Sequence, residues 1–106
     1  MTHEEFIQSL ENIYKESVTI AKAKNKDYSV DSDPFKNFRF APFVGVTVER
    51  GILVRLCDKI SRVSNLLEKE ASVKDEGIED TLKDLINYSA ILLTYLKSQK
   101  AKTHDI

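Results

Sequence analysis

Two aspartates that stand four residues apart offer the first chemistry in this sequence, in the stretch EDTLKDLINY. At this spacing Asp80 and Asp84 lie on one face of a helix, about one turn apart, with Asn87 close by. Mg²⁺ prefers carboxylate oxygens and would relieve the repulsion between the two like charges. The alternative is a solvated acidic face near a helix start, where the helix dipole favours anions. The residues alone favour this alternative over a metal site.

A second set of residues points to phosphate recognition. Arg55, Asp58 and Arg62 recur at helical spacing. They fit a ladder of salt bridges along one helix. They equally fit a site in which Asp58 faces Asp80 and Asp84 across a helical hairpin while the arginines hold phosphate, for which the planar guanidinium is suited. The two interpretations stay open.

A lysine cluster lies where the first helical pattern ends. Lys22, Lys24 and Lys26 come just before Asp27 and Tyr28. The lysines either complement the dipole of a helix end or clamp a phosphate beside an aromatic ring that stacks on a base.

The segment Asp27 to Val46 lacks helical periodicity but is rich in aromatic residues. Loops of this length are usually functional or disordered, and the aromatic content argues against disorder. We expect most of its rings, Phe38 among them, to plug the end of a helical bundle, while one of them or Tyr28 stacks on a ligand. Asn37 suits either a base edge or a turn cap.

Three segments of helical periodicity must position these residues. They run from about Thr2 to Asn25, Thr47 to Lys69 and Glu76 to Lys100. Thr2 followed by Glu5 forms a capping box, and Ser72 and Asp75 are the expected caps of the third segment. The middle of that segment, Leu85 to Leu96, is apolar almost all round, which predicts burial on two sides and a second subunit as the cover.

The predicted architecture is therefore a single all-α domain over residues 1–106. It is an antiparallel bundle of three main helices completed by homo-oligomerisation, with a short link at 71–75 joining the last two helices as a hairpin. Three glycines and two prolines are too few for a β-fold with many turns.

Composition limits the classes of partner. The net charge of −1 provides no electrostatic case for binding long DNA. Cys57 is the only cysteine, which excludes a disulfide framework. No apolar run is long enough to span a membrane and no secretory signal is visible, so the expected location is the cytoplasm.

Three stretches together resemble the nucleotide-modification-associated domain family, which is common in tailed phages. They are KNKDYSVDSDPFKNFRF, RGILVRLCDKISRVSNLL and VKDEGIEDTLKDLINYSAIL. The elements K-x-x-DY, NF, R-x-x-DK-x-x-R and ED-T-L-x-D-L-x-N-Y occur in order between Lys24 and Leu96, which is more specific than any one of them. For a phage-encoded protein the expected location is the host cytoplasm.

That family in turn is similar to the MazG-like all-α NTP pyrophosphatases, in which carboxylates of two antiparallel helices hold Mg²⁺ on a triphosphate. The resemblance implies a phosphorylated nucleotide as ligand and Mg²⁺ as cofactor. It implies Asp58, Asp80 and Asp84 as catalytic residues, with Glu79 as a further metal ligand. The residues expected to bind the nucleotide are Lys24, Lys26, Asp27, Tyr28, Asn37, Phe38, Arg55, Lys59, Arg62, Asn87 and Tyr88.

One departure from the pyrophosphatase pattern bears on these expectations. The second helix should supply two carboxylates one turn apart, but Arg55 stands three residues before Asp58, and Glu49 lies on the opposite side. Three hypotheses follow: a Mg²⁺-dependent nucleotide pyrophosphohydrolase, a non-catalytic protein that sequesters a cyclic or linear nucleotide signal of host defence, and a purely structural helical oligomer.

Overall fold

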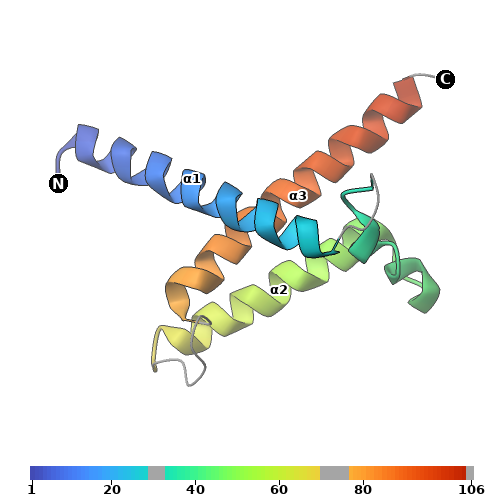
Figure 1. Ribbon diagram of the computed structural model, residues 1–106. Coiled ribbons are helices and arrows are strands. Elements are labelled where there is room, and N and C mark those ends of the chain that lie inside the picture. Colours follow the sequence, from blue (N-terminus) through green and yellow to red (C-terminus); the bar gives the residue numbers. More distant parts are fainter. Residues whose placement is uncertain (29–32, 70–76, 105–106) are drawn as a thin grey trace.

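Every regular element in the described part of the chain is a helix, as the sequence predicts. The computed structural model describes residues 1–28, 33–69 and 77–104. The elements are three long helices and two short 3₁₀ helices (Figure 1): α1 (His3–Tyr28), η1 (Lys36–Phe38), η2 (Ala41–Val44), α2 (Val48–Leu66) and α3 (Ile78–His104). Within the described residues, no helix combines the length and apolarity that crossing a bilayer requires.

The first two long helices begin at threonine caps. The backbone N–H of Glu5 donates to Thr2 Oγ1 at 3.1 Å, which confirms this half of the predicted capping box. The backbone N–H of Arg50 donates to Thr47 Oγ1 at 3.3 Å. Helix α1 continues to Tyr28, beyond the predicted end, so the lysine cluster is helical throughout.

Helix α3 starts two residues later than expected, at Ile78. The carboxylate of Asp80 accepts a hydrogen bond from the backbone N–H of Gly77 at 3.3 Å and so caps the helix that carries it. The predicted caps Ser72 and Asp75, and the link they belong to, lie outside the described residues.

The long helices meet in two different ways (Figure 1). Helices α2 and α3 run antiparallel and form the main helix–helix contact. Helix α1 crosses the middle of α3 and does not run along the length of α3. The N-terminal half of α1 extends away from the other helices. The crossing point brings the C-terminal half of α1 to α3, while α2 approaches α3 from another side.

A small core lies where α2 begins and η1 covers α3. Val48, Ile52 and Tyr95 are its buried members. The ring of Phe35 packs edge-on against the ring of Tyr95, with centroids 5.2 Å apart. Phe38 of η1 also packs against this core, so Phe35 and Phe38 plug the end of the α2–α3 pair as predicted. Phe40 and Phe43 are 65% and 81% exposed, so the prediction does not hold for these two rings.

Gly51 marks a close approach between α2 and η2. A Cβ at position 51 would lie 2.8 Å from the Cβ of Ala41, which cannot move without its backbone. We expect Gly51→Ala to lower the free energy of unfolding by about 1–2 kcal/mol, the cost of overpacking, although alanine favours a helix by about 1 kcal/mol over glycine.

Thermal unfolding followed by circular dichroism tests this expectation. The control is Ser64→Ala at an exposed position of the same helix, where the better helix former should leave the melting temperature unchanged or slightly higher. If Gly51→Ala raises the melting temperature as the control does, the close contact with Ala41 is wrong.

Candidate functional site

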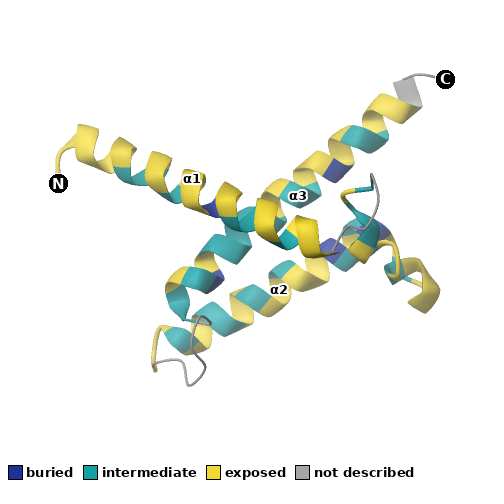
Figure 2. Ribbon diagram, viewed as in Figure 1, coloured by how far each residue is buried: buried dark blue, intermediate teal, exposed yellow. Residues whose placement is uncertain are grey.

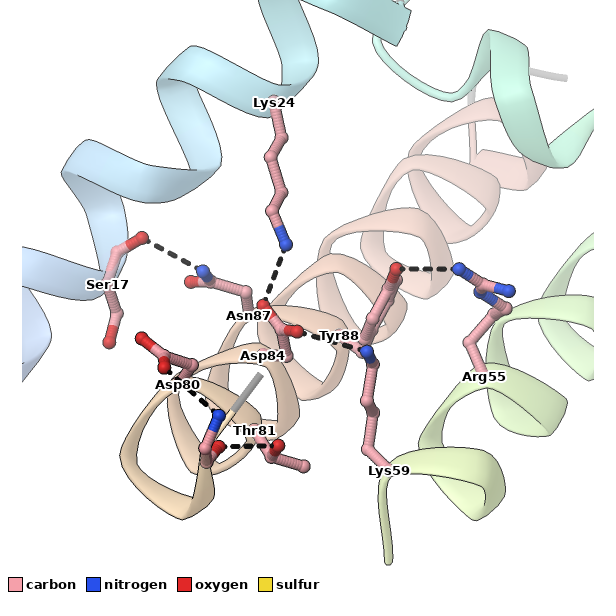
Figure 3. A network of polar contacts seen from close by, with 10 residues as sticks. Ser17, Lys24, Arg55, Lys59, Asp80, Thr81, Asp84, Asn87 and Tyr88 are labelled. Atoms are coloured by element: carbon pink, nitrogen blue, oxygen red, sulfur yellow. Dashed lines mark hydrogen bonds and ion pairs between the residues drawn. The ribbon is translucent and has the colours of Figure 1, made fainter. Parts of the chain in front are cut away.

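Asp84 joins all three long helices through two ion pairs (Figure 3). Its Oδ1 lies 2.9 Å from Lys24 Nζ of α1, and its Oδ2 lies 3.1 Å from Lys59 Nζ of α2. The Asp84 side chain is only 16% exposed. Each oxygen of one carboxylate therefore holds one lysine, and the three residues come from segments far apart in the sequence.

The charge of this carboxylate is maintained by its partners. Burial acts to raise the pKa of Asp84, but hydrogen bonds and charges from Lys24 and Lys59 outweigh burial, and the pKa is lowered below the ordinary 3.8. A carboxyl group with a depressed pKa in the folded state stabilises the fold above its ordinary pKa, and this contribution is lost as pH falls through the depressed value. Both ion pairs of Asp84, which we call the Asp84 clamp, are therefore intact at neutral pH.

Two further contacts tie α3 to its neighbours beside this clamp. Asn87 Nδ2 donates to the backbone oxygen of Ser17 at 2.9 Å, which fixes α1 on α3. Arg55 Nη2 donates to Tyr88 Oη at 3.4 Å, and the guanidinium lies 5.7 Å from the centre of the Tyr88 ring. Asn87 and Tyr88 thus connect α3 to α1 and α2 respectively (Figure 3).

A pocket of about 530 Å³ opens between the C-terminal half of α1, η1 and α3. Its volume falls in the range of small-molecule sites, roughly 300–1,000 Å³. Aromatic and aliphatic side chains form much of its wall, and lysines and amides provide the polar groups. Its lining residues are Val18, Ala21, Lys22, Lys24, Asn25, Lys26, Pro34, Phe35, Asn37, Phe38, Asp84, Asn87, Tyr88, Ala90, Ile91 and Thr94.

A second, more polar groove of about 330 Å³ lies on α2. Its lining residues are Arg55, Asp58, Lys59, Ser61, Arg62 and Asn65. The contacts described above connect the two hollows, because Lys59 reaches Asp84 and Arg55 reaches Tyr88. Arg55, Asp58 and Arg62, which were predicted to recognise phosphate, therefore line a separate groove next to the pocket.

Many of the residues predicted to bind a nucleotide lie around the first pocket. Those that line it are Lys24, Lys26, Asn37, Phe38, Asn87 and Tyr88, together with the predicted catalytic Asp84. Asp27 is exposed and is not part of the lining. Tyr28 ends α1, and its side chain lies outside the described residues. Whether these residues bind a ligand stays a prediction.

The carboxylates predicted to share a metal ion make separate contacts in the structure. Among the described residues, no group of three or more acidic, histidine or cysteine side chains is placed to hold a metal ion. Asp58 lines the α2 groove, Asp80 caps α3, and the oxygens of Asp84 contact lysines. Glu79 is exposed in the first turn of α3. Asp58 does not face Asp84 because consecutive residues of a helix point in different directions. Lys59, the next residue of α2, is the one that reaches Asp84.

Several pocket residues were not among the sequence predictions. Ile91 and Thr94 line the pocket, as do Val18 and Asn25. The spacing of Val18, Ala21 and Asn25 on α1, and of Asn87, Ile91 and Thr94 on α3, is the signal that could have found them, since residues three and four apart share a helix face.

The fold and the pocket together describe a small all-α domain whose cavity is bordered by lysines. A sequence model of the family described as "Nucleotide modification associated domain 1" matches residues 24–96. The chain belongs to this family, as its three motif stretches predict. The match includes the pocket-lining residues from Lys24 to Thr94. Comparisons with curated proteins and with solved structures gave no match.

Proposed function

We propose that this protein binds a phosphorylated nucleotide in the pocket between α1, η1 and α3. The observation that carries the proposal is that aromatic side chains and Lys22, Lys24 and Lys26 line one cavity of about 530 Å³. A nucleotide needs both parts, a flat apolar surface for its base and cations for its phosphates. The family description, which associates the domain with nucleotide modification, supports the same class of ligand.

The aromatic side of the pocket suits a base. Phe38 packs edge-on against Tyr88, with ring centroids 6.3 Å apart, and both rings line the cavity. Base–aromatic stacking contributes roughly 1–3 kcal/mol per base and accepts any base. The side-chain amides of Asn37 and Asn87 also line the cavity, and each carries both a donor and an acceptor for a base edge.

The lysine side of the pocket suits phosphate. Lys22 and Lys26 are exposed, and Lys24 is partly exposed beside Asp84. An ammonium group has three donors, so one lysine can contact a carboxylate and a phosphate oxygen together. In this proposal Asp84 orients Lys24 toward the ligand, and the local basic cluster attracts phosphate despite the net charge of −1.

The geometry favours binding over metal-dependent hydrolysis within one chain. Mg²⁺ in the MazG-like pattern needs several carboxylates on one ion, but both oxygens of Asp84 contact lysines, and Asp80 accepts the hydrogen bond that caps α3. The described carboxylates therefore do not fit a shared Mg²⁺. Sequestration of a nucleotide signal of host defence, linear or cyclic, is the form of this function that needs no metal.

A thermal-shift screen tests the proposal. Nucleoside mono-, di- and triphosphates, with cyclic forms, are each added at 1 μM to 1 mM in EDTA and again in Mg²⁺. A ligand that binds only the folded state raises the free energy of unfolding by mass action, by about 2.7 kcal/mol at one hundred times its Kd. The melting temperature rises as a result. We expect shifts in EDTA for at least one nucleotide, and smaller shifts for the matching nucleoside and for inorganic phosphate.

Two outcomes would contradict this proposal. If no nucleotide shifts the melting temperature at 1 mM, the pocket does not serve this ligand class. If shifts occur only with Mg²⁺ and product forms over time, the protein is a metal-dependent hydrolase and the binding-only form is wrong.

A further inference from the structure

The chain exposes far more surface than a compact domain of its mass. Its accessible surface is 8309 Å², whereas a folded monomer of 12.1 kDa exposes about 6,000 Å². Its radius of gyration is 16.0 Å, against about 13 Å for a compact chain of this length. The surplus of about 2,300 Å² is as large as the area that one subunit contributes to an obligate homodimer interface.

Part of this surplus lies on the N-terminal half of α1. Phe6, Leu10, Tyr14 and Ser17 share one face of the helix by their spacing. The face is buried at Ser17, which is 1% exposed and accepts the hydrogen bond from Asn87. Toward the N-terminus the same face continues past α3, and there Phe6 and Tyr14 are 49% and 53% exposed (Figure 2). We call Phe6, Leu10 and Tyr14 the α1 stripe.

Helix α3 carries a second uncovered apolar surface. Leu82, Leu93 and Leu96 are 44%, 56% and 43% exposed. Helical periodicity places them within about one third of the helix circumference, on the side away from Asp84 and Asn87, which face α1. We call these three leucines the α3 stripe. Neither stripe includes a charged side chain among the residues that define it.

We propose that a second copy of this chain covers the α1 stripe with its own α3 stripe, and that the exchange is reciprocal about a two-fold axis. Each copy then uses both stripes in one closed interface. On α1 the proposed interface continues the helix face that already packs on the Asn87 side of α3 within one chain at Ser17. The partner contributes the opposite face of its α3, which α1 of its own chain leaves uncovered.

The small core explains why the partner should be the chain itself. Among the described residues only Val48, Ile52 and Tyr95 are buried hydrophobics. A fold with so little buried apolar surface needs its partner whenever it forms, and an identical chain is the one partner always present at matching concentration. This inference does not depend on the proposed nucleotide site.

The test is the mass of the full chain in solution, measured by sedimentation velocity from 1 to 100 μM. The wild-type protein should have at least twice the monomer mass of 12.1 kDa, and its melting temperature should rise with concentration. Phe6→Glu and Leu93→Glu should each shift the equilibrium toward the monomer by 100-fold or more. Gln8→Glu, which adds the same charge to another face of α1, should leave the wild-type mass unchanged.

The variants also distinguish the outcomes. Unfolding of Phe6→Glu at a concentration where Gln8→Glu stays folded supports the proposal, because Phe6 lies in the half of α1 that extends away from the other helices of its own chain. A wild-type monomer at 100 μM overturns it. If Phe6→Glu lowers the mass but Leu93→Glu does not, the pairing of the α1 stripe with the α3 stripe is wrong.

Discussion

Asp84→Asn is expected to lower the melting temperature by about 5–15 °C, and added nucleotide is expected to recover much of that loss. The substitution removes the charge that holds Lys24 and Lys59, whose ammonium groups lie 2.9 and 3.1 Å from its two oxygens. Breaking a pair that is partly buried should cost about 1–3 kcal/mol, and 1 kcal/mol corresponds to roughly 4–8 °C in a domain of this size.

The recovery follows from the same charges. Without the carboxylate, the two lysines repel each other, and a bound phosphate would replace the missing negative charge. ATP in EDTA should therefore raise the melting temperature of Asp84→Asn more than that of the wild-type protein. Glu11→Gln, an equal charge change at an exposed position of α1, is the control and should change neither value by more than about 2 °C.

The opposite pattern has a clear meaning. If Asp84 is a metal ligand, the wild-type protein should gain stability from ATP only with Mg²⁺, and Asp84→Asn should lose that gain. Such a result would favour the hydrolase hypothesis, and the contacts of Asp84 with Lys24 and Lys59 would then describe only the metal-free form.

Lys24→Ala is expected to weaken nucleotide binding by about 10- to 100-fold, measured by isothermal titration calorimetry. A hydrogen bond to a charged group contributes about 1.5–3 kcal/mol, and each 1.4 kcal/mol is a tenfold change in Kd. Lys24 lines the pocket and is oriented by Asp84. The matched control is Lys15→Ala, an exposed lysine of α1 outside the pocket lining, which should leave Kd within about twofold.

Arg62→Ala tests whether the nucleotide binds in the pocket between α1, η1 and α3 or in the α2 groove. Arg62 lines the α2 groove and not the pocket, so its removal should change Kd much less than Lys24→Ala does. If Arg62→Ala costs roughly 1.5–3 kcal/mol of binding while Lys24→Ala has no effect, the phosphate lies in the α2 groove, and the site proposed between α1 and α3 is misplaced.

The local features of this protein could be predicted from the order of its residues. Apolar residues at spacings of three and four located all three long helices, and Thr2 with Glu5 located the start of α1. The ordered motifs from Lys24 onward identified the family. These features depend on neighbours within one or two helical turns, whose geometry is the same in any α-helix.

The pairing of side chains across helices depends on how the helices pack, and the sequence did not predict it. Asp84 and Lys24 are sixty residues apart, and their spacing in the chain says nothing about contact. Consecutive residues of a helix point about 100° apart, so a small rotation of α2 determines whether Asp58 or Lys59 faces α3. Packing of its apolar residues sets that rotation, and it directs Lys59 to Asp84 and leaves Asp58 in a separate groove.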